Sequence, residues 1–186
     1  MKPDKITTYG LLDVCDFIPG TRTKTTDGSY FIYGAGMKPK GTIDKFNCES
    51  DTIRLTRKGT VGAVYFHRDP FWMEEASFKV EPKEMIDKRY LFHWLLMKRE
   101  EIERCADGDN QPGLSIVRLS KITIEVPDME YQLKVVKLLD EMSTALEFFI
   151  DNITQIKTLE DKVLSYYNEK IETALERETN EQQARL

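Results

Sequence analysis

Residues 134–167 read KVVKLLDEMSTALEFFIDNITQIKTLEDKVLSYY, and this stretch decides the fold of the C-terminal part of the chain. Apolar side chains recur in it at alternating steps of three and four residues, which is the heptad spacing of a coiled-coil seam. The two apolar heptad positions hold Val135, Leu139, Met142, Leu146, Phe149, Ile153, Ile156, Val163 and Tyr167. Glu160 interrupts the series and Ala174 continues it. The pattern predicts a long dimerisation helix over residues 128–178 and a polar tail over residues 179–186.

This predicted helix needs a partner for its apolar side. Asp128 is a good N-cap residue, and no Gly or Pro follows Pro127. At 1.5 Å per residue the helix would be about 70 Å long, more than a single domain over residues 1–127 can cover. A second chain is therefore the simplest partner. The alternative is a helix that breaks and folds back on itself, which the lack of Gly and Pro disfavours.

The segment before Pro127 has a mixed pattern of short elements. Strands are predicted at residues 29–33, 52–56, 60–66, 76–80 and 122–126, which are rich in β-branched and aromatic side chains. Turns are predicted at residues 34–36, 57–59 and 107–113, where Gly, Asp and Pro gather. One helix is predicted over residues 87–104. The sequence thus predicts an α+β domain with a mostly antiparallel sheet, followed by the long helix.

The charge of the chain is unevenly distributed. Its net charge is −5, but residues 1–68 hold 11 Lys and Arg against 7 Asp and Glu, a local charge of +4. Residues 128–186 hold 7 against 13, a local charge of −6. Nucleic-acid binding requires a basic face rather than a basic whole, so the N-terminal excess is compatible with it. Ordinary scatter of charge is the alternative explanation.

The composition of the chain also indicates its cellular compartment. No apolar run approaches the roughly 20 residues of a membrane span, and no apolar signal core follows the N-terminus, so a cytoplasmic protein without membrane contact is expected. Cys15, Cys48 and Cys105 are far apart and lack metal-ligand spacing, which predicts three reduced thiols and no metal site.

Only fragments of known catalytic motifs occur in the sequence. The His67-Arg68-Asp69 triplet matches part of a kinase catalytic loop, but the other kinase motifs are missing. Residues 34–36 (GAG) lack the third glycine of a dinucleotide fingerprint. Asp69 with Glu81 and Lys83 faintly suggests a nuclease, although Pro82 would disturb the strand. His93, between two aromatic residues, suits packing. We therefore expect a recognition or assembly role without catalysis.

Several segments of the chain, taken in order, match the motifs of one known protein family. Residues 30–36 (YFIYGAG) with 41–44 resemble the entry motif, and residues 55–62 (LTRKGTVG) resemble the next segment. Residues 69–72 with Ala76 fit a third block, and residues 111–114 with 119 and 122–127 fit the closing block before the long helix. Gln132 stands where the family usually has Glu-Gln, although Tyr131 precedes it here. Together these segments resemble the DNA specificity subunits of type I restriction–modification systems.

The resemblance implies a half-length specificity subunit, because the usual subunit has two recognition domains and two helices. It implies that two copies pair their helices antiparallel and read a bipartite inverted repeat in double-stranded DNA. It also implies a methyltransferase (M) subunit that uses S-adenosylmethionine and a restriction (R) subunit driven by ATP with Mg, so that this chain holds no cofactor and is not an enzyme. A fragment of a longer subunit, and a coiled-coil assembly protein without DNA binding, are the alternatives.

Cations in loops are the predicted DNA contacts, since Lys and Arg bind phosphates and base edges. The candidates are Arg22, Lys24, Lys38, Lys40, Arg57, Lys58 and Arg68. The segment 19–26 (PGTRTKTT) is the most attractive, because it joins two cations to four threonine hydroxyls. For each cation a solvated surface charge is the alternative, and for residues 57–59 a tight turn between strands is another.

Overall fold

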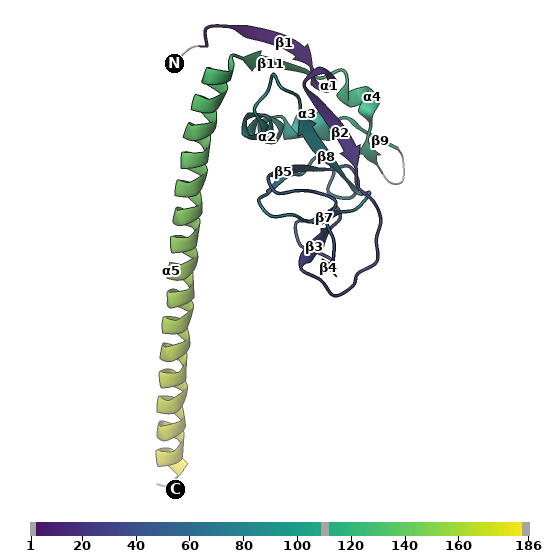
Figure 1. Ribbon diagram of the computed structural model, residues 1–186. Helices are drawn as coiled ribbons and strands as arrows, with labels where there is room; N and C mark the ends of the chain where they lie inside the picture. Colours follow the sequence, from purple (N-terminus) through teal and green to yellow (C-terminus); the bar gives the residue numbers. More distant parts are fainter. Residues whose placement is uncertain (1–2, 109–111, 184–186) are drawn as a thin grey trace. The chain divides into compact units, whose positions relative to one another are not determined.

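The computed structural model describes residues 3–108 and 112–183, with the side chains of the last helix described up to Ile171. The chain divides into two compact units, residues 1–138 and 139–186. The first unit combines short helices with small, mostly antiparallel sheets (Figure 1). Helix α5 (Met129–Gln183) begins in the first unit and forms the second. The α+β class and the long C-terminal helix predicted from the sequence are confirmed.

A four-stranded antiparallel sheet forms the centre of the first unit. Its order is β2 (Cys15–Pro19), β8 (Ser77–Pro82), β5 (Thr52–Thr56) and β6 (Val64–His67). Successive side chains of a strand point to opposite faces. On β5, Ile53 and Leu55 join the main core, which leaves Thr52, Arg54 and Thr56 on the other face. All five residues are nevertheless buried, so both faces of β5 are covered.

Short helices cover the main core. They are α1 (Leu11–Val14), α2 (Lys88–Met97), α3 (Arg99–Glu103) and α4 (Ile116–Leu119), and each contributes fully or nearly fully buried apolar side chains. The Asp87 side chain caps α2 by accepting from the Tyr90 amide at 2.9 Å. The predicted single helix over residues 87–104 is wrong in one respect. The chain leaves the helical conformation at Lys98 (φ −92°, ψ 12°), which separates α2 from α3.

A second, three-stranded sheet lies at one end of the first unit. Its order is β4 (Gly41–Ile43), β3 (Tyr30–Tyr33) and β7 (Trp72–Met73), with β3 antiparallel to β4 and parallel to β7. Cys48, Phe71 and Met73 form a small separate core there. The antiparallel pair β1 (Ile6–Gly10) and β11 (Thr123–Pro127) lies at the other end of the unit (Figure 1). A short pair, β9 (Ala106–Asp107) and β10 (Gly113–Leu114), completes the strands of the described residues.

Four of the five predicted strands correspond to β3, β5, β8 and β11. The fifth, predicted over residues 60–66, begins only at Val64, because the preceding residues form a turn. Gly59 (φ 73°) and Gly62 (φ 78°) adopt left-handed backbone conformations, and the Gly62 amide donates to the Thr56 carbonyl at 3.0 Å. Part of the predicted turn over residues 107–113 and the Ala174 side chain lie outside the described residues.

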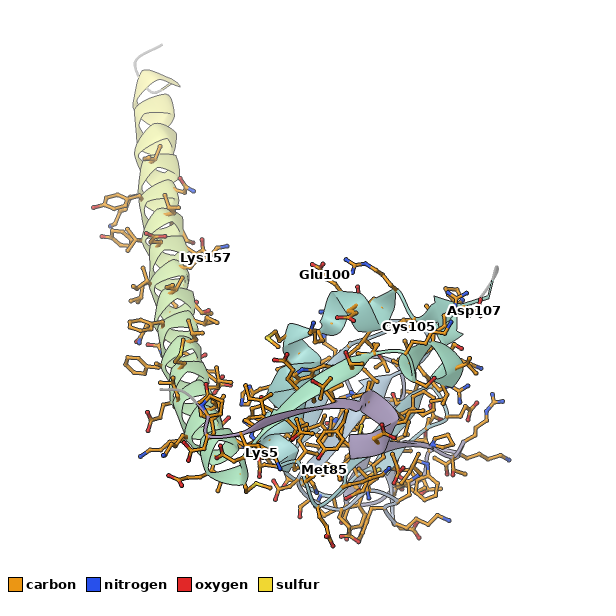
Figure 2. All side chains as sticks on the ribbon, turned by 90° about the horizontal axis from the view of Figure 1, so that it is seen from above. Lys5, Met85, Glu100, Cys105, Asp107 and Lys157 are labelled. Carbon is orange, nitrogen blue, oxygen red and sulfur yellow. The ribbon has the colours of Figure 1, made fainter. Side chains whose placement is uncertain are left out.

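The start of α5 is bonded to the rest of the first unit. The Asp128 side chain accepts from the Tyr131 amide at 2.8 Å and from the Asp4 amide at 3.0 Å, which confirms the predicted N-cap. The Gln132 side chain is fully buried and bonds to the segment before α2. Lys5 and Met85, whose carbonyls accept bonds from this first turn, lie beside it (Figure 2).

Helix α5 extends to Gln183, beyond the end at residue 178 predicted from the sequence. The division into a domain at 1–127, a helix at 128–178 and a tail at 179–186 stays a prediction. The three cysteines are free and buried, as expected for reduced thiols. Burial raises the pKa of the Cys15 thiol to about 12 and that of Cys48 to about 11. Within the described ranges, no helix has the length and apolar character needed to cross a membrane.

Candidate nucleic-acid interface

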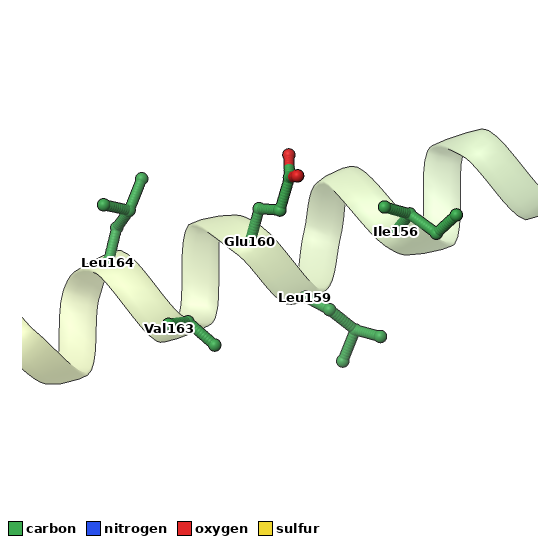
Figure 3. Close-up of a pocket in the computed structure, with 5 residues that line it drawn as sticks. All are labelled: Ile156, Leu159, Glu160, Val163 and Leu164. Carbon is green, nitrogen blue, oxygen red and sulfur yellow. The ribbon is translucent and has the colours of Figure 1, made fainter.

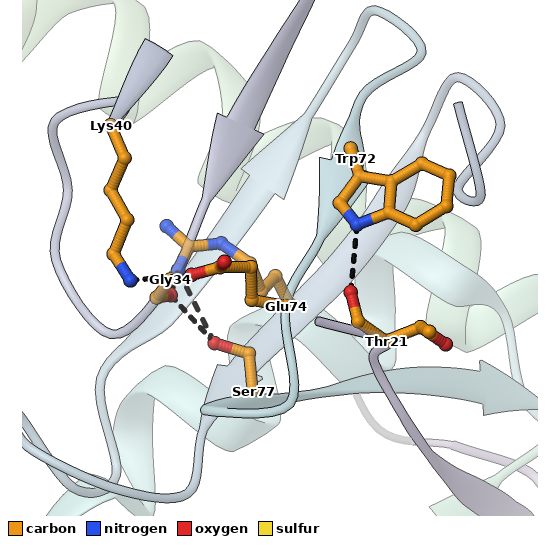
Figure 4. Close-up of polar contacts among 7 residues, drawn as sticks. Thr21, Gly34, Lys40, Trp72, Glu74 and Ser77 are labelled. Carbon is orange, nitrogen blue, oxygen red and sulfur yellow. Dashed lines mark hydrogen bonds and ion pairs between the residues drawn. The ribbon is translucent and has the colours of Figure 1, made fainter. Parts of the chain in front are cut away.

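The loop between β2 and β3 is fixed at its ends and exposed in its middle. The Gly20 amide donates to the Ser77 carbonyl at 3.1 Å, and the Trp72 indole donates to the Thr21 carbonyl at 2.7 Å (Figure 4). A Cβ at Gly20 would meet backbone atoms of residues 73 and 74 at 2.3–2.6 Å, so this close approach requires glycine. Arg22 and Lys24 are exposed and lie between these anchors and Thr26, whose amide donates to the Thr42 carbonyl at 3.0 Å. The structure therefore presents both predicted cations on an anchored loop.

Lys38 and Lys40 lie in the loop between β3 and β4 and differ in environment. Lys38 is exposed, and the structure gives it no partner. The Lys40 ammonium pairs with the carboxylate of Glu74, whose side chain is only 12% exposed (Figure 4). A phosphate would therefore have to compete with Glu74 for Lys40. The contact of either lysine with DNA stays a prediction.

The remaining three predicted cations differ in their exposure. The Arg57 guanidinium lies 4.8 Å from the Phe78 ring centroid and is half-buried, with its Nε atom buried and unbonded. Lys58 is exposed beside an isolated bridge to Gly113, and Arg68 is exposed after β6. Gly59 adopts φ 73°, as a tight turn after Arg57 and Lys58 requires. Lys58 and Arg68 are thus accessible, whereas Arg57 is partly committed to packing.

A buried cluster around Arg54 was not predicted from the sequence. Its guanidinium donates to the Gly34 carbonyl at 2.6 Å, the Gly36 carbonyl at 3.0 Å and His67 Nε2 at 3.0 Å. It also lies 4.3 Å from the Tyr65 ring centroid, within the range of a cation–π interaction. An alternating strand such as β5 is typical of a sheet with one solvent face, which would expose Arg54. Tyr33 at the end of β3 and the loop that follows it cover Arg54 instead.

His67 is neutral in this cluster. Its ring stacks on Phe71 with a centroid distance of 4.0 Å, and its Nε2 accepts from Arg54 Nε at 3.0 Å. Burial, and then the nearby Arg54 charge, lower the pKa of His67 from 6.5 to about 4. Burial likewise lowers the pKa of Arg54 to about 10, so the guanidinium stays charged near neutral pH. His67 therefore acts as a hydrogen-bond acceptor within the fold.

No metal centre appears among residues 3–108 and 112–171, where no cluster of His, Cys, Asp and Glu side chains could hold an ion. The fragments that suggested catalysis are accounted for structurally. His67 belongs to the buried cluster, and Asp69 lies in an exposed turn. Glu81 pairs with Lys79 at 2.6 Å on β8.

Helix α5 carries a second candidate surface. Val135 and Leu139 are half-buried, but the later residues of the predicted seam are 53–64% exposed. Those residues are Met142, Leu146, Phe149, Ile153, Ile156, Val163 and Tyr167. Figure 3 shows Leu159 and Val163 on one side of the helix and Glu160 on the other. A row of exposed apolar side chains of this length is typical of an interface.

The chain matches the model of the type I restriction modification DNA specificity domain over residues 3–161. The chain belongs to this family. Two Mycoplasma pneumoniae proteins described as type I specificity subunits are 29% and 28% identical to it over 123 residues, or 66% of the chain. The match covers 35% of the first relative and 81% of the second, which is described as a C-terminus.

Solved specificity subunits share the fold of this family member. The type I S subunit of M. genitalium superposes with a TM-score of 0.69 at 22% identity, covering 79% of this chain and 43% of the other. The HsdS subunit of Thermoanaerobacter tengcongensis superposes with a TM-score of 0.60 at 16% identity, covering 79% and 39%. The chain thus spans less than half the length of these specificity subunits.

Proposed function

We propose that the chain is the DNA-recognition subunit of a type I restriction–modification complex and that it works as a homodimer. The observation that carries the proposal is the exposed apolar seam of α5, from Met142 to Tyr167, in a specificity-domain chain with one recognition unit. A seam of this length is stabilised by a second helix with the same spacing. Two copies paired antiparallel hold one recognition unit at each end of the helix pair.

Symmetry then determines the form of the DNA target. Two identical readers related by a twofold axis read two inverted half-sites. The length of the paired helices sets the distance between the half-sites. The anchored loop with Arg22 and Lys24 and the exposed Lys38, Lys58 and Arg68 supply contacts to double-stranded DNA.

Catalysis belongs to other subunits in this proposal. A methyltransferase (M) subunit supplies adenine methylation with S-adenosylmethionine, and a restriction (R) subunit supplies ATP-driven translocation with Mg. We assign the M-subunit contact to the outer face of α5, which carries acidic residues. These are Asp140, Glu141, Glu147, Asp151 and Asp161. A solvated helix face is the other explanation of these charges.

The experiment measures DNA binding and mass together. The purified chain, alone and with its M subunit, is incubated with random-sequence duplex and with a duplex selected from a randomised library. Binding is followed by gel shift, and mass by sedimentation. The proposal predicts a dimer that selects a sequence and retains the M subunit. A dimer that selects no duplex in either state would identify a coiled-coil assembly protein instead. Metal-dependent cleavage by the chain alone would identify a nuclease.

A further inference from the structure

The loop of residues 34–40, between β3 and β4, is built on a buried guanidinium. Arg54 Nη1 donates to the Gly34 carbonyl at 2.6 Å, and Nη2 donates to the Gly36 carbonyl at 3.0 Å. The Ser77 hydroxyl donates to the same Gly34 carbonyl at 2.9 Å (Figure 4). The two outer nitrogens of one planar group thereby fix two carbonyls that lie two residues apart. This fork geometry is available to arginine and not to lysine.

Burying the charged side chain of Arg54 costs free energy of folding, which indicates that the residue has a specific role. Its side chain is fully buried on β5, and no carboxylate of the described residues pairs with it. An unpaired buried charge destabilises a protein unless hydrogen bonds satisfy it. Its acceptors are the two loop carbonyls, His67 and Ser77, and the Tyr33 and Tyr65 rings flank it at 5.1 and 4.3 Å. Most of the stabilisation of this charge therefore comes from the loop and its neighbours.

The far end of the loop is also fixed. The Lys40 amide donates to the Ile32 carbonyl at 2.8 Å, and the Lys40 ammonium pairs with Glu74. Between the two fixed ends, Met37 is 75% exposed and Lys38 follows it, also exposed. An apolar side chain beside a cation suits a DNA groove. The apolar side chain can contact thymine methyl groups or base steps, and the cation can contact guanine edges or phosphates.

We propose that Arg54 is a positioning residue that holds the loop of residues 34–40 so that Met37 and Lys38 contact base edges in the DNA target. This inference rests on the proposed function and adds the residue that sets the shape of one reading loop. Arg54 itself is buried and does not touch DNA. A fixed loop loses less conformational freedom on binding, which favours the cognate sequence over other sequences.

The test compares Arg54→Lys and Arg54→Met with Ile53→Ala. Ile53 is a fully buried neighbour on the same strand that joins the main core, so its truncation is a control for destabilisation alone. Affinity is measured for a duplex selected by the wild-type protein and for a shuffled duplex. Both Arg54 variants should lose at least about tenfold in affinity for the selected duplex, a loss of about 1.4 kcal/mol, and less than about threefold for the shuffled one. Ile53→Ala should keep the wild-type ratio of affinities for the selected and the shuffled duplex.

Two further measurements keep the proposal testable if the Arg54 variants fold poorly. Met37→Ala and Lys38→Ala alter only exposed side chains and should reduce selectivity without lowering the unfolding temperature. Hydrogen exchange of the Lys40 amide should be faster in Arg54→Lys than in Ile53→Ala. The positioning role is overturned if Met37→Ala and Lys38→Ala keep the wild-type ratio of affinities for the selected and the shuffled duplex. It is equally overturned if both Arg54 variants keep that ratio, and in either case the proposed function stands. If the wild-type protein selects no duplex, both are overturned.

Discussion

The backbone amide of Asp87 donates to Oε1 of Gln132 at 2.7 Å, which joins the start of α2 to the first turns of α5. The Nε2 atom of Gln132 donates to the Pro127 carbonyl at 2.9 Å and to the Met85 carbonyl at 3.1 Å. The Gln132 side chain is fully buried, so these three bonds satisfy an amide that water cannot reach. One side chain thus bonds the base of the long helix to the recognition unit.

Replacing Gln132 tests this junction. Gln132→Ala leaves the Asp87 amide without its acceptor and two carbonyls without a donor, so we expect a loss of about 2 to 3 kcal/mol in the free energy of unfolding. Chemical denaturation followed by the fluorescence of the buried Trp94 measures this loss. Leu133→Ala is the matched control, because Leu133 is the next residue and is 53% exposed. Equal effects of the two substitutions would contradict the role of Gln132.

The acid stability of the first unit should depend on His67. As the pH falls below 6.5, His67 in the unfolded chain takes up a proton, whereas the folded imidazole stays neutral until about pH 4. The unfolded state binds more protons in this window, so the free energy of unfolding falls as the pH decreases. His67→Gln keeps an acceptor for Arg54 but removes the titration.

The comparison of wild-type protein with His67→Gln isolates this contribution from the carboxylates that both share. Between pH 7 and pH 4.5 the wild type should lose roughly 2 to 3 kcal/mol more than the variant. Denaturant titrations at the two pH values supply the measurement. Parallel losses in both proteins would show that His67 titrates normally in the folded state.

The loop between β2 and β3 should contribute to DNA affinity through its charge. Replacing Arg22 and Lys24 with alanine removes two exposed cations, so the slope of log affinity against log salt should decrease by about 2. Fluorescence anisotropy with a labelled duplex over a range of salt concentrations measures the slope. The double substitution Arg104→Ala and Lys121→Ala removes the same charge from other exposed positions and should leave it unchanged. Identical slopes for both double variants would remove Arg22 and Lys24 from the interface.

The seam of α5 should control self-association. Phe149→Glu combined with Ile153→Glu places carboxylates where two apolar side chains are 61% and 64% exposed in the single chain. We expect the dissociation constant of the dimer to rise by more than about 100-fold, since buried unpaired charge is strongly unfavourable. Sedimentation over a range of concentrations measures it. Thr144→Glu with Thr158→Glu adds the same charge on exposed positions away from the seam and should leave the dimer intact.

The strongest sequence signals predicted their elements correctly. The heptad spacing predicted α5, Asp128 predicted its start, and four aromatic and β-branched segments correspond to β3, β5, β8 and β11. Short strands such as β7 (Trp72–Met73) escaped prediction, because two residues show no periodicity and this strand is defined only by its parallel pairing with β3. The segment over residues 60–63 looks like a strand by composition, yet the left-handed Gly62 makes it a turn.

In the candidate site, only the exposed cations could be predicted from the sequence. Arg22, Lys24 and Lys38 lie on exposed loops, as a cation in a Gly- and Thr-rich segment suggests. Arg54 could not be found in this way, because its burial depends on Tyr33 and on the loop after β3, which are distant from it in the sequence. The pairing of Lys40 with Glu74 has the same origin, since these two residues meet only when β3, β4 and β7 assemble.

Mapping methylated adenines in a genome that carries this gene and its M subunit shows whether two copies read one DNA target through paired helices. We expect one motif made of two inverted half-sites with a spacer of fixed length. Substitutions in the seam, such as Phe149→Glu with Ile153→Glu, should abolish its methylation. A methylated motif that lacks inverted symmetry, or one that persists with the seam disrupted, would show that paired copies of this chain do not read the target.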